Sequence, residues 1–232
     1  MKRRNFYFIY TAAMVLVLMC AYWGSRAVTV ISERLPIARQ HCIVLDPGHG
    51  GEDGGATSCT GVLESAYNLE ISRRLNDLLH FLGYETRMIR TEDVSVYTTG
   101  DTIARKKISD LKERVRMVNE TENALLVSIH QNQFSDSRYS GAQVFYANTD
   151  GSRELAQQLQ AELVAALNPG SSRKCKQSSG VYLMDNIRCT GVLVECGFLS
   201  NPQEEARLRS SDYQRKLCCV LASTLSRYLS DT

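Results

Sequence analysis

Several short motifs that would assign a chemistry directly are missing from this sequence. There is no CxxC pair, no HExxH motif, no GxSxG serine motif and no GK[ST] lysine. These absences exclude a CxxC zinc or redox site, a zincin-type protease, a serine hydrolase with a nucleophile elbow and a P-loop nucleotidase. The glycines of residues 48–55 also do not give GxGxxG in the register that a dinucleotide-binding loop requires.

The sequence has little excess charge and no pattern that indicates a nucleic-acid partner. It contains 27 Lys and Arg against 25 Asp and Glu, a formal net charge of +2. The basic residues are scattered without interleaved aromatic residues, so we expect no nucleic-acid binding. Several of the eight cysteines lie in apolar runs, which predicts small buried hydrophobic residues in place of disulfides. These cysteines are Cys42, Cys196, Cys218 and Cys219.

The N-terminus has the pattern of an export signal. Three basic residues, Lys2, Arg3 and Arg4, precede an almost uncharged apolar run over residues 6–24. This pattern predicts a cytoplasmic N-terminus and an exported domain. No convincing small-x-small cleavage site follows, so an uncleaved signal anchor is favoured over a removed signal peptide for residues 1–24. Residues 25–40 are predicted to be a linker. The chain should therefore act outside the cytoplasmic membrane and be anchored to it.

The remaining residues, 41–232, are predicted to form one α/β domain. Short apolar runs alternate with longer amphipathic stretches. The expected strands are 42–46, 84–90, 124–130, 141–147, 181–184 and 192–195, and the expected helices are 65–82, 103–119, 152–167 and the segment after Pro202. This alternation predicts a mostly parallel, twisted sheet flanked by helices on both faces.

Three polar residues follow or end predicted strands, namely His49, His130 and Glu195. Loops at the carboxyl ends of parallel strands converge on one crevice, so we expect these side chains to be neighbours. A hydrolytic zinc site needs neutral imidazoles, usually one carboxylate, and an open position for water. Each histidine could equally be a structural group. The other two, His41 and His80, are predicted to be structural or solvated.

A third ligand can be sought among the carboxylates near the glycine loop. Glu64 is the best placed, because residues 61–63 could fold back beside His49, although acidic residues are also ordinary in a first helical turn. Asp46 could brace His49 or bond loop amides, and Glu52 and Asp53 also lie nearby.

Glu195 ends a buried strand, where desolvation raises the pKa of a carboxyl and suits a general base. A helix cap or a salt bridge is the alternative role for Glu195.

A set of separated segments together resembles one family. The segments are Leu45-Asp-Pro-Gly-His-Gly-Gly51, Gly61-Val-Leu-Glu64 with Asn68-Leu69, Arg90-Thr91, Glu113-Arg114, Ser128-Ile-His-Gln-Asn132 and Glu195-Cys-Gly-Phe-Leu-Ser-Asn201. In order and number they resemble the zinc-dependent N-acetylmuramoyl-L-alanine amidases of the amidase-3 type. The resemblance spans about residues 42–230, the whole predicted domain.

The resemblance implies a specific site and activity. It implies Zn²⁺ bound by His49, Glu64 and His130, Glu195 as the catalytic base, and Asn132 as part of the substrate site. The substrate would be peptidoglycan, cut at the amide between N-acetylmuramic acid and L-alanine. The chain departs from the common family pattern without losing any of these groups. The departures are Ser65 for lysine, Gln131 for alanine and Thr190 for proline.

The compact form, with an N-terminal anchor and no wall-binding repeats, is similar to the CwlD-type amidases of spore-forming bacteria. That similarity implies a role in spore-cortex maturation, in muramic-δ-lactam formation with a partner deacetylase, and hence in germination. It also implies a site in the mother cell–forespore intermembrane space and leaves room for an envelope accessory protein.

Two alternatives remain open: a general wall-turnover amidase and a zinc peptidase acting on stem peptides. A catalytically silent binding or regulatory module is disfavoured, because His49, Glu64, His130 and Glu195 are all present. The link Gln131–Ser140 is short and polar, so no inhibitory helix is expected there.

Overall fold

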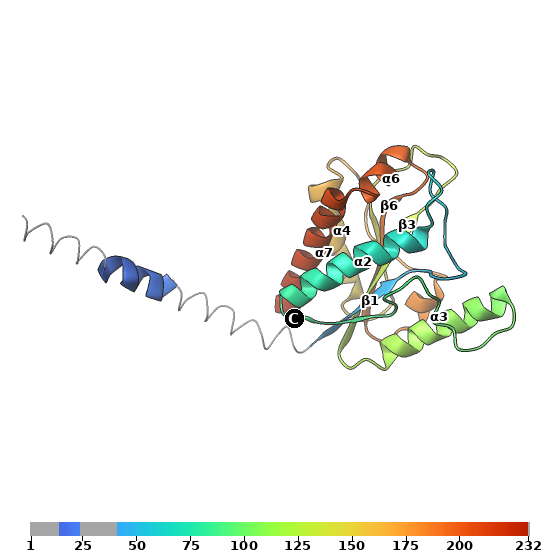
Figure 1. The fold of residues 1–232 in the computed structure, drawn as a ribbon, viewed down its shortest axis with the longest axis horizontal. Coiled ribbons are helices and arrows are strands. Elements are labelled where there is room, and N and C mark those ends of the chain that lie inside the picture. Colours follow the sequence, from blue (N-terminus) through green and yellow to red (C-terminus); the bar gives the residue numbers. More distant parts are fainter. Residues whose placement is uncertain (1–13, 24–40, 232) are drawn as a thin grey trace, which may run out of the picture.

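The computed structural model describes residues 14–23 and 41–231 (Figure 1). Residues 14–23 form a short exposed helix, and within the described residues no helix is both long and apolar enough to cross a membrane. Most of the predicted anchor and the whole predicted linker, residues 25–40, lie outside the described residues. The predicted domain boundaries therefore stay predictions.

Residues 41–231 alternate between strands and helices, as the sequence pattern predicts. The strands are β1 (Cys42–Pro47), β2 (Glu85–Met88), β3 (Ala124–Asn132), β4 (Gln143–Tyr146), β5 (Lys176–Gln177) and β6 (Thr190–Phe198). The helices are α2 (Glu64–Phe81), α3 (Ile103–Asn119), α4 (Ser152–Leu167), α5 (Tyr182–Asn186), α6 (Pro202–Leu208) and α7 (Ser211–Asp231).

The six strands form one sheet in the order β2-β1-β3-β6-β4-β5. β1 pairs in parallel with β2 and β3, and β3 pairs in parallel with β6. β4 is antiparallel to β6 and parallel to the short β5. The expected mostly parallel sheet is confirmed, with the longest strands at its centre. Strands buried on both faces carry continuous apolar runs, which is why β1 and β3 have no polar alternation over most of their length.

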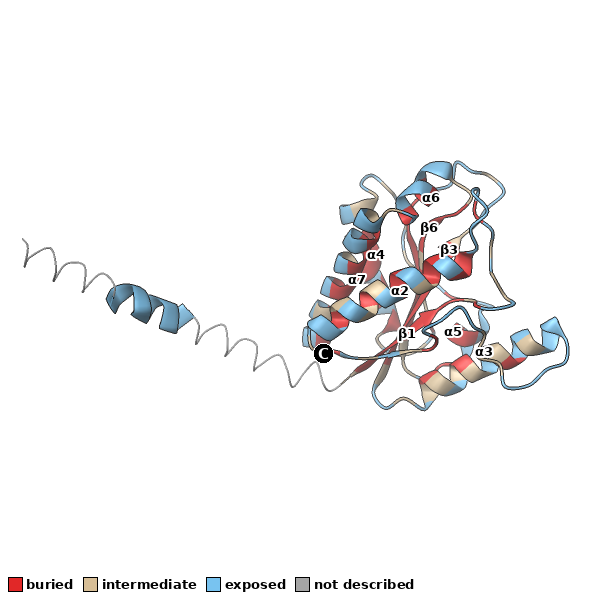
Figure 2. Cartoon of the chain, in the orientation of Figure 1, coloured by how far each residue is buried: buried red, intermediate tan, exposed pale blue. Residues whose placement is uncertain are grey.

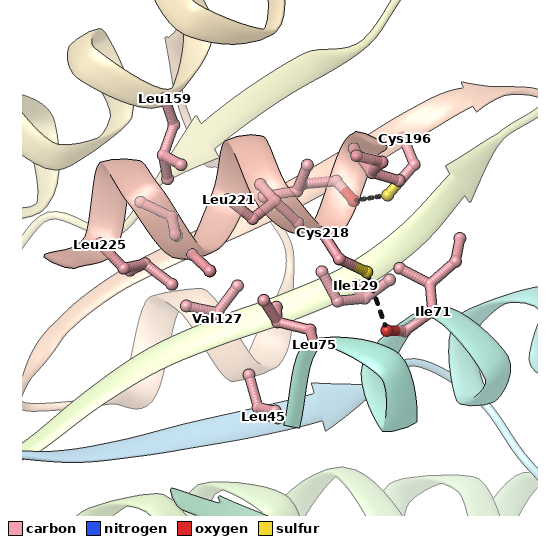
Figure 3. Packing of buried hydrophobic residues seen from close by; sticks show 14 of the residues in the cluster. Leu45, Ile71, Leu75, Val127, Ile129, Leu159, Cys196, Cys218, Leu221 and Leu225 are labelled. Atoms are coloured by element: carbon pink, nitrogen blue, oxygen red, sulfur yellow. Dashed lines mark hydrogen bonds between the residues drawn. The ribbon is translucent and has the colours of Figure 1, made fainter. Parts of the chain in front are cut away.

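Helices cover both faces of this sheet, so each helix buries one stripe and exposes the other (Figure 2). α2, α4 and α7 contribute to the larger apolar core on one face, and α5 packs with α3 on the other. Figure 3 shows the larger core, in which the thiol of Cys218 lies 3.6 Å from the carbonyl oxygen of Ile71. Cys42, Cys196 and Cys218 are buried free thiols, as predicted.

Two sequence-based expectations are wrong. Residues 181–184 were expected to form a strand but belong to α5 and the residue before it. A four-residue apolar run does not distinguish a strand from a buried helical turn, and here the consecutive Leu183 and Met184 are both buried, as on a helix face. Cys219 is exposed, because it follows Cys218 on α7 and lies beyond the buried stripe of that helix.

Candidate metal centre

The loop after β1 has a backbone that few residue types adopt. His49 has a φ of 61°, in the left-handed region, and Gly51 has a φ of 60°. A Cβ atom on Gly48 would lie 2.2 Å from the His130 ring, and one on Gly55 would lie 2.6 Å from His49 and 2.7 Å from Glu64. The glycines therefore turn the chain after a buried strand and let the backbone pass directly against these side chains.

Two histidines and one glutamate converge above the ends of β1 and β3. Nε2 of His49 lies 3.3 Å from Oε2 of Glu64, and Nδ1 of His130 lies 2.9 Å from Oε1 of Glu64. The ligand atoms of the three residues all lie within 4.8 Å of one another. The structure thus brings together the three residues that the sequence suggested as metal ligands.

The position of Glu64 follows from the local fold. It is the first residue of α2, and its backbone N–H donates to the carbonyl of Ala56 at 2.8 Å. The loop 50–63 therefore closes on itself and returns the glutamate to the side of His49. The Glu64 side chain is 5% exposed, whereas those of His49 and His130 are 21% and 20% exposed. The buried carboxylate lies beneath two imidazoles that solvent can reach.

This donor set fits a zinc ion. Two imidazole nitrogens and one carboxylate, open on one side, are the ligands of many hydrolytic zinc sites. Although burial raises the pKa of Glu64, hydrogen bonds with His130 and His49 hold it well below its ordinary value. Burial lowers the pKa of His49, but Glu64 and Asp53 outweigh that effect and raise it. The acidic surroundings that favour a histidine proton equally favour a metal cation.

Asp53 orients the first histidine. Its Oδ2 lies 3.0 Å from Nδ1 of His49, on the side of the ring away from Glu64, and it also pairs with Lys107 at 3.1 Å. Metal-binding histidines commonly use their second nitrogen in this way. The suggestion that Asp46 braces His49 is wrong, because Asp46 accepts hydrogen bonds from Arg114 and Ser128. Glu52 pairs with Lys106 at 2.6 Å, away from the histidine.

Two buried arginines hold the carbonyl groups of the glycine loop. Arg90 donates to the carbonyls of Pro47 and Gly48 at 2.9 and 3.0 Å. Arg114 donates to the carbonyls of Pro47 and His49 at 3.0 and 2.7 Å. Three consecutive carbonyls are thus fixed by guanidinium groups, which keeps the loop in its left-handed conformation. Sequence patterns do not assign these arginines this role, since their partners are backbone atoms from a distant segment.

Glu195 lies beside His130, on the next strand of the sheet. The two residues are register partners on β3 and β6. Glu195 is partly exposed, yet its Oε2 atom is buried and has no hydrogen-bond partner. Burial raises the pKa of Glu195 to about 7, against the opposing effect of His130. Within residues 41–231 Glu195 makes no ion pair, so the salt-bridge alternative is wrong and a free carboxylate remains beside the ligand group.

The other predicted residues lie as follows. Asn132 is the last residue of β3, where its carbonyl accepts a hydrogen bond from the N–H of Leu199 at 2.8 Å. Its side chain is partly exposed, and its role toward a substrate stays a prediction. His80 lies in the last turn of α2, 2.6 Å from the hydroxyl of Thr86. It is separate from the ligand group, as expected.

Comparisons with known proteins find one family over most of the chain. Residues 43–226 match the family model of the N-acetylmuramoyl-L-alanine amidases, Amidase_3. The chain is 38% identical over 191 residues to the germination-specific N-acetylmuramoyl-L-alanine amidase of Bacillus subtilis (strain 168), which covers 82% of this chain and 80% of that protein.

Two solved structures are similar over most of the chain. The CwlD amidase from Clostridioides difficile, solved in complex with the GerS lipoprotein, has a TM-score of 0.78 and 34% identity, covering 83% of this chain and 100% of that one. An N-acetylmuramoyl-L-alanine amidase from Clostridium difficile 630 has a TM-score of 0.71 and 29% identity, covering 83% and 98%.

Proposed function

This chain belongs to the N-acetylmuramoyl-L-alanine amidase family, Amidase_3, and from that premise we propose that it is a zinc-dependent enzyme whose site is the group described above. In this proposal His49, Glu64 and His130 hold the metal and Glu195 is the catalytic base. The bond cut is the amide between the lactyl group of N-acetylmuramic acid and L-alanine in peptidoglycan. The observation that carries the proposal is an unpaired, buried carboxylate oxygen beside an open His-Glu-His group.

A bound zinc ion would supply Lewis-acid polarisation of the scissile carbonyl and a water of lowered pKa. The chain's own residues do the rest. Glu195 accepts the proton of the attacking water on its free oxygen and returns it to the nitrogen of the leaving alanine. Burial raises the pKa of Glu195, and a raised pKa suits both steps, because the group must take up a proton and release it within one turnover.

The other groups around the site act by holding the ligands still. Asp53 fixes the orientation of the His49 ring, and Arg90 and Arg114 fix the backbone that carries it. Asn68 and the backbone of Gln131 both donate to Oε1 of Glu64, at 3.2 and 3.1 Å. Metal affinity depends on such partners as well as on the ligands themselves.

The test is zinc content combined with product analysis of digested muropeptides. An amidase releases intact stem peptides that begin with L-alanine, whereas a peptidase on the same fold leaves part of the peptide on the sugar. Stoichiometric zinc and free intact stem peptides are expected. Cleavage between amino acids would overturn the assignment of the bond, and a folded, fully active protein without zinc would overturn the metal assignment.

The cellular role we propose is spore-cortex maturation, with muramic-δ-lactam formation and germination as its consequences. It is supported by the similarity to the germination-specific amidase. The C. difficile relative was solved with a lipoprotein, which supports an envelope lipoprotein as the partner class in preference to a deacetylase. Deleting the gene should abolish muramic-δ-lactam in the cortex. Normal lactam in the deletion strain would favour general wall turnover.

We further propose that residues 1–24 anchor the domain outside the cytoplasmic membrane, in a sporulating cell in the space between mother cell and forespore. β1 begins at Cys42, and the candidate site lies at the opposite end of the same strands. A domain attached through residues 25–40 would therefore direct its site away from the linker. Membrane fractionation with and without residues 1–24 tests the anchor. Equal distribution of both forms would exclude it.

A further inference from the structure

An exposed aromatic cluster lies just beyond the candidate site. Phe134 and Tyr139, on the link between β3 and β4, have ring centroids 4.8 Å apart and side chains that are 52% and 46% exposed. Tyr139 stacks at 6.2 Å on Phe198, the last residue of β6, and the Arg173 guanidinium lies 4.9 Å from the centre of the Phe198 ring. The link was expected to be merely short and polar.

The cluster is held in place by hydrogen bonds. The N–H of Phe134 donates to Oγ of Ser200 at 3.2 Å, and the side-chain amide of Asn201 donates to the carbonyl of Tyr139 at 3.2 Å. Gln133 donates to the carbonyl of Thr57 at 3.2 Å, which ties the link to the loop that precedes Glu64. Exposed aromatic rings on a fixed segment form a surface suited to binding, because a ligand that covers them removes apolar area from water.

The cluster is close to the reacting groups. Phe198 is three residues beyond Glu195 on β6, and Asn132, two residues beyond His130, is its register partner on β3. At the rise of a β-strand, three residues correspond to roughly 10 Å. A substrate bound at the metal group would therefore extend over the rings if it ran in this direction.

Tyr139 also lines a groove of about 1180 Å³ in the surface. Side chains with planar polar groups contribute to its lining, among them Arg138, Arg173, Asn168, Asn201 and Gln203. Amide and guanidinium groups can satisfy the hydroxyl and acetamido groups of a sugar, and aromatic faces can cover its C–H faces. An aromatic edge that leads into a polar groove is thus chemically matched to a carbohydrate chain.

We propose that Phe134, Tyr139 and the groove beside them bind the glycan strand of the substrate, with the stem peptide leaving the site on another side. This inference rests on the proposed function, since it assumes that the scissile amide joins a sugar to a peptide. It adds a glycan-binding surface outside the metal group and assigns the two rings a role in substrate affinity and none in the chemical step.

The test measures binding of peptide-free glycan strands to the zinc-loaded full chain in detergent, by titration calorimetry. Phe134→Ala and Tyr139→Ala should each weaken binding by about three- to tenfold, whereas Tyr139→Phe, which keeps the ring, should bind as the wild type does. Phe81→Ala is the matched control, because Phe81 is an 85% exposed aromatic residue at the far end of α2. In hydrolysis of whole peptidoglycan the two alanine variants should raise KM and leave kcat unchanged.

The outcomes separate this inference from the proposed function. If the wild type releases intact stem peptides but binds peptide-free glycan no better than the Phe134→Ala and Tyr139→Ala variants do, the glycan surface is wrong and the amidase assignment stands. If free stem peptides bind the wild type more tightly than the Phe134→Ala and Tyr139→Ala variants, and peptide-free glycan does not, the groove binds the stem peptide and the glycan surface is wrong. If the wild type cleaves no muramoyl amide, the proposed function fails first, and glycan binding by the wild type alone would still support the surface.

Discussion

His130 and Glu195 are register partners on two neighbouring parallel strands. This pairing places one metal-ligand candidate and one base candidate side by side at the same height of the sheet, without any loop between them. Both are therefore positioned by backbone hydrogen bonds of β3 and β6, which are among the most rigid parts of such a fold. We therefore expect a substitution of His130 to remove metal binding, and a substitution of Glu195 to remove proton transfer while the metal stays bound.

The Glu195→Gln variant should keep zinc and lose hydrolysis. Glutamine keeps the shape of the side chain but cannot accept the water proton, so we expect kcat to fall by about 10²- to 10⁴-fold. Bound zinc per protein and rates on purified muropeptides should be measured on the same preparation. Turnover within a factor of a few of the wild type would remove Glu195 from the mechanism.

The ionisation of Glu195 should make kcat/KM depend on pH in one direction. Burial raises the pKa of Glu195 to about 7, and only the ionised carboxylate can act as a base, so kcat/KM should fall as the pH decreases. A bound dication would lower this pKa by favouring the charged form. The acidic limb should therefore lie at or below pH 7. A kcat/KM that stays flat from pH 8 down to the acid limit of folding would contradict the assignment.

The sequence predicted the architecture well because the signals were strong and local. Long amphipathic stretches predicted α3 and α4 with the bounds that the structure shows. Continuous apolar runs predicted β1 and β3. The short segment 181–184 failed because its pattern fits two structures. Strand ends suggested His49, His130 and Glu195. Asp53 was one of three carboxylates near the first histidine, and which of them meets His49 depends on how the glycine loop turns. Arg90 and Arg114 were not assigned their roles, since those depend on which backbone carbonyls a distant segment presents.

Removal of the metal ligands should abolish both zinc binding and activity. His49→Ala and Glu64→Ala each leave two ligands, too few for a tight hydrolytic zinc site. Because a metal that binds only the folded state stabilises it, a chelator should lower the Tm of the wild type and leave the Tm of these variants unchanged. His80→Ala, a histidine outside the group, is the control. A chelator effect of equal size on all proteins would point to metal bound elsewhere.

The buried pair of Asp46 and Arg114 should make stability sensitive to acid. Burial raises the pKa of Asp46, but Arg114 and Ser128 outweigh this and lower it below its ordinary value. A carboxyl with a lowered folded-state pKa contributes stability above its unfolded pKa, and that contribution is lost as the pH falls. Arg114→Met leaves Asp46 buried without its cation and should cost about 3–5 kcal/mol in the free energy of unfolding.

Two further measurements check this pair. Asp46→Asn combined with Arg114→Met should cost less than Arg114→Met alone, because the uncompensated charge is gone. Arg105→Ala, which breaks an exposed pair with Asp101, should change the unfolding curve little. If the double variant were the least stable protein, the buried charge would not be the cause.

Two side-chain amides form a chain of hydrogen bonds that ends on Glu64. Gln131 donates to Oδ1 of Asn68 at 3.2 Å, and Asn68 donates to Oε1 of Glu64 at 3.2 Å. Because Asn68 touches the carboxylate itself, Asn68→Ala should weaken zinc binding by about 10- to 100-fold. Gln131→Ala should weaken it less, since this side chain acts only through Asn68 and its backbone N–H still reaches Glu64.

The measurement is the zinc dissociation constant, obtained by competition with a chromophoric chelator. In the double variant the loss should not exceed that of Asn68→Ala alone, because both substitutions interrupt one chain of contacts. Gln133→Ala, which removes a neighbouring amide that contacts Thr57, should leave zinc affinity unchanged. Additive losses, or a larger effect of Gln131→Ala, would mean that the glutamine supports the site by packing and not by orienting Glu64 through Asn68.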